Sequence, residues 1–430
     1  MRRRSPTPVL ALLALTALAA APGRAAGPTL YQHGGRATAQ AGAFTARGAT
    51  PVAVTYNPAA ITRLDGLQFE VGFDFTAPRD DYSSRTGDFA ADHIITLSPA
   101  VYATWHTPED RYPFAFGLGF NSESWYFMDW EPALFPGRFL NRRQELSLWD
   151  AQAVIAYELD ERWSVGAGVH YYFGTLGEGR NRVLPVAGQG GFVHSIEVAR
   201  LAEADIDGLG FDLGFQFDGG TWGWGLVADS GAELEGTGEV KYAPRDVPAD
   251  PVLQSNLAAR FGTGTSRQSF ELPWEVRTGF WAAPYPELRL ELDVAYQAWS
   301  VIDTTVLEVQ PNPFSATRRE ATVRDWHDTV SVRLGLEGDV ADHWMVSAGL
   351  GWEPSPVPRQ TLDPGFPRGD ALVYAVGFSY VLPQVSIDVG YSFHDYGSTQ
   401  ATGQEPQNPR VNGSYETRNQ VWALSGSWKW

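Results

Sequence analysis

The feature that most constrains the fold is an alternation of apolar and polar residues that recurs along most of the chain. In LRLELDVAYQ (288–297), leucine, valine or tyrosine occupies nearly every second position, and VSVRLGLEG (330–338) and FDLGFQFD (211–218) repeat the pattern. Successive side chains of a strand point to opposite faces, so this period of two predicts strands with one apolar and one polar face. The sequence therefore predicts an all-β fold.

Fourteen segments carry this pattern, and the connections between them alternate in length. Short connections such as LDER, DGG, PYPE and LPQ follow the even-numbered segments, and long connections follow the odd-numbered ones. Short periplasmic turns, long outer loops and an even strand number are the rule in outer-membrane barrels, and they place both termini in the periplasm. We therefore predict a 14-stranded antiparallel transmembrane β-barrel with strands at approximately 67–77, 93–106, 113–122, 144–159, 161–176, 203–218, 220–242, 270–283, 286–309, 324–339, 341–353, 369–382, 383–397 and 415–430. The long connections are expected at 80–92, 121–143, 177–202, 243–269, 310–323, 354–368 and 398–414.

Aromatic residues favour a membrane environment over a soluble β-sandwich. They cluster beside the short connections, as in Tyr157 and Trp163, which is the arrangement of an interfacial girdle. The last segment, VWALSGSWKW (421–430), ends on an aromatic residue and resembles the signal that the barrel-assembly machinery reads. That machinery and the outer-membrane lipid are therefore expected partners.

The first residues have the pattern of a secretory signal peptide, predicted to span 1–25. A basic start is followed by the apolar run Val9–Ala21 and by small residues that suit cleavage after Ala25. Removing the four arginines of this segment takes the formal net charge from −18 to −22, which argues against nucleic-acid binding. The mature chain has no run of 18 apolar residues for a membrane helix, and it has no cysteine for a disulfide or thiolate metal site. We expect an outer-membrane protein of a Gram-negative bacterium, with no cofactor or metal.

Residues 26–66 do not alternate and are predicted to form a plug of short helices, the hatch, inside the barrel 67–430. A lumen of fourteen strands is wider than one that side chains alone fill. In TYNPAAITRL (55–64), Asn57 suits the N-cap and Pro58 the first position of a short helix that continues through Ala59. The Asn-Pro-Ala tripeptide also occurs in water channels, but those need several membrane helices. A purely structural role for these residues is an equally good interpretation.

The chain resembles the FadL family of outer-membrane transporters for long-chain fatty acids and aromatic hydrocarbons. The resemblance covers Ala26–Trp430 and rests on AGPTLYQHGGRATAQAGAF with YNPAAITRLDG, on LFPGRF, and on WSVGAGVHYYFG, AYQAWSVID and WEPSPVPRQTLDPGFPRGD in this order. It implies a 14-stranded barrel with an N-terminal hatch and passive uptake of hydrophobic small molecules by a monomer. The ligand would be captured by outer loops, held in an apolar luminal pocket and released sideways near strand 3.

The resemblance assigns candidate residues to each step. Ligand capture in an outer loop is expected from Trp125, Tyr126, Phe127, Met128, Trp130, Phe135, Arg138 and Phe139. Packing of these side chains against a neighbouring loop is the alternative. The hatch candidates are His33, Arg36, Arg47, Asn57, Pro58 and Ala59, whose charged members could couple to luminal acids such as Asp293 or serve as plug anchors. The strand-3 exit is expected at Pro113, Gly117, Gly119, Phe120 and Asn121, where glycine would weaken pairing.

The charge of the lumen bears on the ligand. VIDTTVLEV (301–309) carries Asp303 and Glu308 and no lysine or arginine, which favours a neutral hydrocarbon over a fatty acid. The arginines on polar strand faces that could meet a carboxylate are Arg277, Arg289 and Arg333.

Two other functions remain as alternatives. An outer-membrane hydrolase of the protease type could use Asp325, His327 and Asp328, with Asp80 and Asp81 in another loop, but no G-x-S-x-G motif of a lipase is present. A general porin would have an open aqueous lumen and no N-terminal plug. We expect a transporter and not an enzyme.

Overall fold

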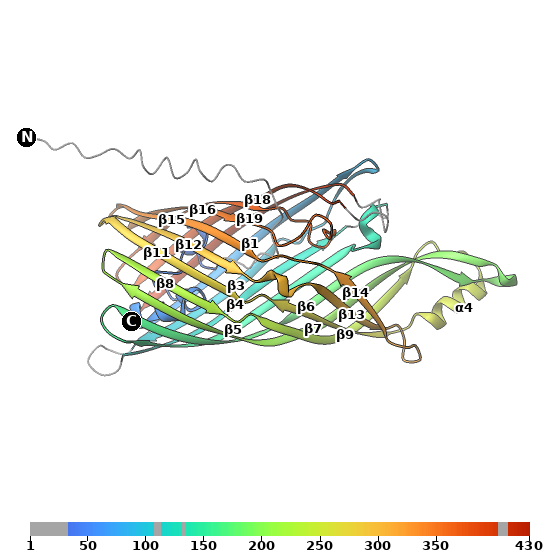
Figure 1. Ribbon diagram of the computed structural model, residues 1–430, viewed down its shortest axis with the longest axis horizontal. Coiled ribbons are helices and arrows are strands. Elements are labelled where there is room, and N and C mark those ends of the chain that lie inside the picture. Colours follow the sequence, from blue (N-terminus) through green and yellow to red (C-terminus); the bar gives the residue numbers. More distant parts are fainter. Residues whose placement is uncertain (1–32, 107–112, 131–133, 403–411) are drawn as a thin grey trace, which may run out of the picture.

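The computed structural model describes residues 33–106, 113–130, 134–402 and 412–430. These residues form one continuous antiparallel sheet that closes on itself (Figure 1). Closure is made by β19 (Ser414–Lys429), which pairs with β1 (Gly66–Ser84) from Gln68↔Lys429 to Ser83↔Ser414. The prediction of a 14-stranded antiparallel barrel is confirmed.

Ten of the fourteen wall positions are single strands and four are strands in two parts. The wall runs, in chain order, through β1 (Gly66–Ser84), β3 (Thr96–His106), β4 (Phe114–Asp129), β5 (Arg143–Glu158), β6 (Trp163–Ala187), β7 (Val193–Asp218), β8 (Trp222–Asp229) with β9 (Ala232–Pro244), β10 (Gly264–Leu272) with β11 (Glu275–Tyr285), β12 (Leu288–Gln297) with β13 (Thr304–Gln310), β14 (Arg318–Val323) with β15 (Thr329–Ala341), β16 (Trp344–Glu353), β17 (Ala371–Val381), β18 (Val385–Gln400) and β19 (Ser414–Lys429). The short strand β2 (Gly87–Ala90) folds back on the end of β1.

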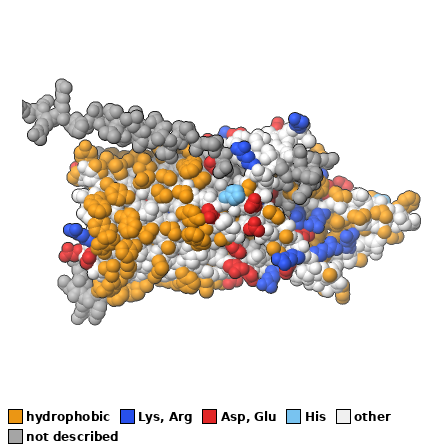
Figure 2. Space-filling view, viewed as in Figure 1, with side chains coloured by type: hydrophobic (Ala, Val, Ile, Leu, Met, Phe, Trp, Pro, Cys, Tyr) orange, Lys and Arg blue, Asp and Glu red, His pale blue; other side chains and the backbone are white. Residues whose placement is uncertain are grey.

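The outer surface of one half of the barrel is a band of apolar side chains, whereas charged side chains gather towards the other half (Figure 2). Leu213 is 64% exposed and Val376 57% exposed on this outer surface, while Asp212, which precedes Leu213 in β7, is buried. Apolar side chains outside and polar side chains inside are the arrangement of a barrel in lipid. No helix in the described ranges is long and apolar enough to cross a membrane.

Two expected loops are instead regular structure. Residues 177–202 belong mostly to β6 and β7, which stay paired as far as Ala187↔Val193, and 243–269 contain α4 (Pro251–Arg260) and the start of β10. These elements form an arm that projects beyond the barrel at the end opposite the C-terminus (Figure 1). The arm folds because it has an apolar core of its own, made of Val186, Ile196, Val198, Leu253 and Leu257.

Residues 33–65 lie inside the barrel (Figure 1, blue). They include α2 (Gly35–Thr38), α3 (Ala53–Tyr56) and the 3-10 helix η2 (Pro58–Arg63), and nearly all of their side chains are buried. Small residues let the backbones approach closely. A Cβ built at Gly166 of β6 would lie 2.5 Å from the carbonyl carbon of Pro58. The luminal segment therefore touches the wall over much of its length.

Four neighbouring wall positions are interrupted at the same level. The interruptions fall at 230–231, 273–274, 298–303 and 324–328, and they are adjacent because Glu275 pairs with both Asp229 and Gln297, which itself pairs with Thr329. The third interruption holds η5 (Trp299–Val301). The side chains of Trp299 and Trp326 are each 3% exposed and pack in the interior cluster of the barrel.

Candidate functional site

The wall is incomplete between β3 and β4. These strands pair only from Val101↔Phe120 to His106↔Ala115. Further along, β3 continues to pair with β1 and β4 with β5, and β4 carries a bulge at Glu123. The two sides meet again at the single bridge Asp92↔Asp129. We call the unpaired stretch between Thr96–Ala100 and Asn121–Met128 the β3–β4 gap.

Four of the five residues expected at the strand-3 exit lie before this gap, and the fifth, Asn121, is the first residue of β4 within it. Pro113 precedes β4, and Phe120 forms the last pair before the gap. Gly117 and Gly119 are paired on both sides, so the expectation that they weaken pairing is wrong. Their missing side chains make room instead, because a Cβ at Gly117 would lie 2.7 Å from the side chain of Val54.

The bulge at Glu123 was not found in the sequence, although a signal for it exists. In FAFGLGFNSESWYFMD the outward apolar positions are even-numbered up to Phe120, whereas the side chains buried after Glu123 are Ser124, Tyr126 and Met128. This change of parity indicates one extra residue in the strand, which is what a bulge inserts.

His33 connects the luminal segment to the rim of the gap. Its Nδ1 lies 3.3 Å from Asp74 Oδ2 and its Nε2 lies 3.1 Å from Asn121 Nδ2. Gln152 donates to Asn121 Oδ1 at 2.9 Å and to Thr55 Oγ1 at 2.8 Å. The luminal segment thus touches the strand edge of the gap through buried polar side chains.

The two arginines of the luminal segment bind wall carboxylates. Arg36 donates from Nε and Nη2 to the two oxygens of Glu337 at 2.6 and 2.7 Å. Arg47 donates to Glu291 at 2.7 Å and to Glu337 at 3.2 Å. Asp293, the expected partner, instead accepts from the backbone N–H groups of Phe44 and Thr45, each at 3.0 Å. Both arginines are therefore bound, but to acids that the sequence did not indicate.

The Asn-Pro-Ala tripeptide begins η2, as its residue types predict. Asn57 Oδ1 accepts from Ala59 N at 3.0 Å, and Pro58 occupies the first turn. Asn57 Nδ2 also donates to Thr45 O at 2.9 Å and to Phe215 O of the wall at 3.2 Å. One side chain thus caps the helix and ties it to the wall.

The aromatic residues expected to form an exposed capture surface are mostly buried. Tyr126, Met128, Trp130 and Phe135 are at most 4% exposed and pack together in the interior, so the expectation of an exposed surface is wrong for these four. Trp130 stacks on Phe135 at 4.5 Å. Phe127 and Phe139 are half-buried, and the side chain of Trp125 lies outside the described part. These side chains pack against the neighbouring connection 354–368, where Tyr126 stacks on Phe366 at 5.5 Å and Trp130 Nε1 donates to Pro364 O at 3.0 Å.

Arg138 holds the outer loop to the arm. It donates from Nε and Nη2 to the two oxygens of Glu197 at 2.9 and 3.2 Å, and its guanidinium lies 4.2 Å from the ring centroid of Phe139. Although burial opposes ionisation, the hydrogen bonds from Arg138 and Asn181 hold the pKa of the Glu197 carboxyl below its usual range.

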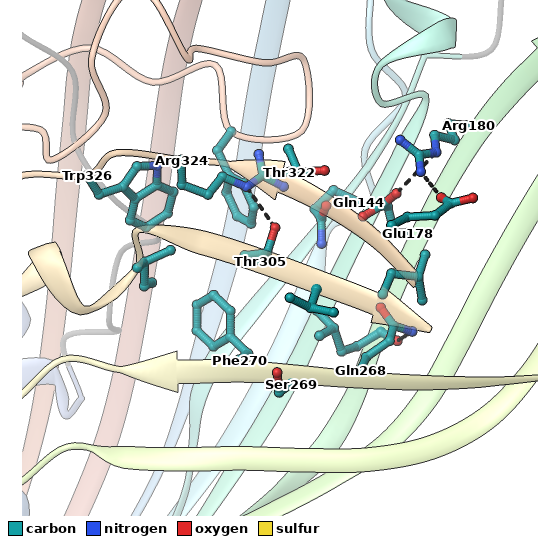
Figure 3. Close-up of a pocket in the computed structure, with 16 residues that line it drawn as sticks. Gln144, Glu178, Arg180, Gln268, Ser269, Phe270, Thr305, Thr322, Arg324 and Trp326 are labelled. Carbon is teal, nitrogen blue, oxygen red and sulfur yellow. Dashed lines mark hydrogen bonds and ion pairs between the residues drawn. The ribbon is translucent and has the colours of Figure 1, made fainter. Parts of the chain in front are cut away.

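A cavity, here called the outer cavity, is lined by residues of β6, β10, β13 and β14 (Figure 3). Phe270 and Trp326 lie at one end of it and Glu178 and Arg180 at the other (Figure 3). Arg324 borders it and donates to Thr305 Oγ1 at 3.2 Å. The cavity has a volume of about 40 Å³, which is room for a few water molecules. A larger ligand needs these side chains to move.

The three candidate luminal arginines are all paired. Arg277 lies 3.1 Å from Glu275 and donates to Tyr56 O at 3.3 Å. Arg289 binds Glu337 and Asp339, each at 2.6 Å, and Arg333 binds Glu353 at 2.9 Å. A ligand carboxylate here would have to displace a carboxylate of the chain.

The residues of the hydrolase alternative do not form a catalytic group. Asp328 accepts from Tyr296 Oη and from Ser300 N, and His327 N donates to Pro356 O. Asp80 is not next to these residues. It lies near the end of β1 and pairs with His93 at 3.2 Å.

Comparison with known proteins identifies the family. A family model described as outer membrane protein transport protein (OMPP1/FadL/TodX) matches residues 12–429. The long-chain fatty acid transport protein of Salmonella typhi is 25% identical over 371 residues, which are 79% of this chain and 80% of that protein. The Escherichia coli K12 protein of the same name is 24% identical over 376 residues, 79% and 81% of the two chains.

Solved structures share the fold. A Pseudomonas aeruginosa FadL homologue has a TM-score of 0.77 and 16% identity, with 95% of this chain and 100% of that chain covered. The toluene transporter TodX of Pseudomonas putida has a TM-score of 0.73 and 15% identity, covering 94% and 99%. Since the family model matches nearly the whole chain, this protein belongs to the OMPP1/FadL/TodX family of outer-membrane transport proteins of Gram-negative bacteria and is not an enzyme.

Proposed function

We propose that this protein carries out passive uptake of hydrophobic small molecules, such as long-chain fatty acids or hydrocarbons, through a lateral exit at the β3–β4 gap. Relatives with these ligands in their names support the class. They are the long-chain fatty acid transport proteins of Salmonella typhi and Escherichia coli, and the toluene transporter TodX. The route would run from the outer loops to the outer cavity, past residues 33–65, and out between the two strands.

The observation that carries the proposal is the unpaired strand edge at the gap. A backbone N–H or C=O group without a partner in lipid costs several kcal/mol, so barrels normally have no open edges in the membrane. The edge of β3 at Thr96–Ala100 and that of β4 at Asn121–Met128 are nevertheless unpaired with each other. The gap lies where His33 of the luminal segment contacts Asn121 of β4. An unpaired edge at this contact favours a passage that residues 33–65 regulate.

The apolar interior supports a hydrophobic ligand. Leu176, Phe270 and Ile302 line the outer cavity together with Trp326 and Phe366, and all five are buried in one cluster. A ligand pocket of this kind is mostly apolar with a few polar groups that fix orientation. The candidate polar groups at its border are Arg180, Arg324 and Glu178. The buried residues Tyr126, Met128, Trp130 and Phe135 belong to the same cluster and would contact a ligand only after it enters.

The remaining parts of the chain have roles consistent with this route. Residues 1–25 would direct export, and 26–66 would act as the hatch that closes the barrel 67–430. With both termini in the periplasm, the aromatic end at Trp430 would be read by the barrel-assembly machinery. The transporter would act as a monomer.

The test is to remove the bulge without removing the strand. Deleting Glu123 takes out the extra residue, which should let β4 pair with β3 beyond Phe120 and close the gap. The matched control is Glu123→Ala, which loses the same side chain but keeps the bulge. Both variants would be expressed in a host that lacks its own transporter of this family, and uptake of radiolabelled oleate and toluene would be measured.

Loss of uptake in the deletion, with uptake retained in Glu123→Ala, is the expected result. Equal uptake by the deletion variant and the parent protein would contradict a lateral exit at this gap. Heat-modifiable migration on a gel would show that each barrel is folded.

A further inference from the structure

A second cavity, here called the inner cavity, lies next to the outer cavity along the same strands. Inward positions of β6 line the outer cavity at Leu176 and the inner cavity at Tyr172, and inward positions of β10 do the same at Phe270 and Leu272. Thr55 of the luminal segment also borders it. The inner cavity has a volume of about 60 Å³ and so has room for a small polar group.

The lining of the inner cavity has more acids than bases. Glu123, Asp150, Asp229 and Glu275 all contribute side chains, and they come from four different strands. Glu275 is compensated because Arg277 lies 3.1 Å away and binds the luminal segment as well. The other three carboxyl groups are left with one possible cation among the lining residues, the imidazole of His170.

His170 is itself shared between two carboxyl groups. Its Nδ1 lies 2.9 Å from Asp150 Oδ2, and its Nε2 lies 3.6 Å from Asp212 Oδ1. Even a charged His170 can therefore offset only one of these acids. Buried carboxylates without a compensating charge are costly, so the lining favours a ligand that brings positive charge.

One acceptor in this lining has no donor. The second oxygen of Asp150, Oδ1, is buried and makes no hydrogen bond within the described part of the chain, and the residue is 1% exposed. A buried acceptor left without a donor destabilises the folded state by roughly 1–3 kcal/mol. This oxygen belongs to a cavity-lining residue and is available to a hydrogen-bond donor that enters.

Part of the lining of the inner cavity is apolar. Leu272 and Pro273 belong to it, and the next inward residue of β10 is Phe270 of the outer cavity. An alkyl chain attached to a group in the inner cavity would therefore extend along Leu272 and Phe270 into the apolar cluster. The described residues hold no set of three side chains placed to bind a metal ion.

We propose that the inner cavity binds the protonated amino group of a long-chain amine, with its alkyl chain directed towards the outer cavity. An ammonium group is a cation and donates three hydrogen bonds, so it matches both the excess of carboxyl groups and the donorless oxygen of Asp150. A fatty acid would present a carboxylate to these carboxyl groups and be repelled. This inference goes beyond the proposed function, since it concerns binding of a ligand class different from fatty acids and hydrocarbons.

Binding of tritiated octylamine to the purified full-length protein, immobilised in detergent at pH 7, tests the inference by scintillation proximity. We expect saturable binding that unlabelled octanol and octanoate displace poorly. Asp150→Asn and Asp229→Asn, tested separately, should each weaken octylamine binding by at least about tenfold, since each removes a charged acceptor. The asparagine of Asp150→Asn keeps an oxygen for His170. The asparagine of Asp229→Asn keeps an oxygen for the N–H of Gly231, which donates to Asp229 at 2.7 Å.

The matched control is Asp207→Asn, which removes the same charge from an exposed position on the outside of β7 and should leave binding unchanged. Octanol binding as tightly as octylamine would overturn the inference, as would unchanged octylamine affinity in both luminal variants. Uptake of oleate or toluene is measured separately. Its failure in the parent protein would contradict the proposed function and leave the binding result intact.

Discussion

Replacing Glu337 with glutamine should release the luminal segment from the wall. Glu337 is completely buried and accepts from Arg36, Arg47 and Arg289. Arg47 retains Glu291 and Arg289 retains Asp339 when Glu337 becomes neutral. Arg36 loses the carboxylate that accepts from both Nε and Nη2. Most of the lost stability is therefore that of α2, the helix that carries Arg36.

The magnitude follows from this pairing. Removing one partner of a buried ion pair costs about 3–5 kcal/mol because the other charge stays buried. In Glu337→Gln this cost disappears when α2 leaves its site and Arg36 reaches water. The equilibrium for opening should therefore rise by about 10²- to 4 × 10³-fold.

Cysteine labelling measures this opening, and the chain has no cysteine that would interfere. Thr38 lies in α2 and is 0% exposed, so Thr38→Cys reports when α2 leaves the wall. The labelling rate of Thr38→Cys should rise about a hundredfold or more when Glu337→Gln is added. The control is Asp339→Asn, which removes an exposed acid that binds Arg289 and not Arg36. A labelling rate that is the same with and without Glu337→Gln would refute the reasoning.

Three further results are expected. Asn57→Ala removes the cap of η2 and a donor to the wall, so hydrogen exchange should be faster across Pro58–Arg63, reflecting about 1–3 kcal/mol of lost local stability. Trp130→Ala leaves a cavity in the interior cluster and should lower the free energy of unfolding by about 3–5 kcal/mol, measured from the urea midpoint of the barrel in detergent. The N–H groups of Gln189 and Leu253 hold the pKa of Asp250 below its usual range. The carboxylate therefore stabilises the N-terminus of α4 at pH values above the usual pKa of an aspartate, and this stabilisation is lost as the pH falls through the lowered pKa. Hydrogen exchange of α4 should increase below about pH 4, and it should increase less in Asp250→Asn.

The barrel could be predicted from the sequence because its determinants are local. Alternation within each strand and the order of short and long connections require no knowledge of distant contacts, and both are visible at 288–297 and its neighbours. Residues 177–202 were predicted to be a loop, but β6 and β7 continue through most of them. The prediction failed there because the strands were assumed to end where a membrane-spanning strand would end.

The contacts of the luminal segment could not be predicted, because they join residues far apart in sequence. Arg36 and Glu337 are separated by 301 positions, and nothing in either neighbourhood distinguishes Glu337 from Asp293 as a partner. His33 and Asn121 were both singled out, but for unrelated reasons, and only the fold brings them together. The residue types of the hatch indicated that its charged side chains bind the wall. Which wall residue each one binds depends on the closed barrel.

The distribution of charge along the interior bears on which ligands cross it. The border of the outer cavity carries Arg180 and Arg324 together with Glu178 and Glu320, so its charges balance, whereas the inner cavity carries an excess of carboxyl groups that includes Glu123 at the bulge beside the gap. On the proposed route a carboxylate would pass from the charge-balanced border of the outer cavity to an acidic lining, and the repulsion would oppose its passage unless it takes up a proton. A neutral hydrocarbon brings no charge into either lining. The order of charges along the proposed route thus favours neutral molecules at the last step.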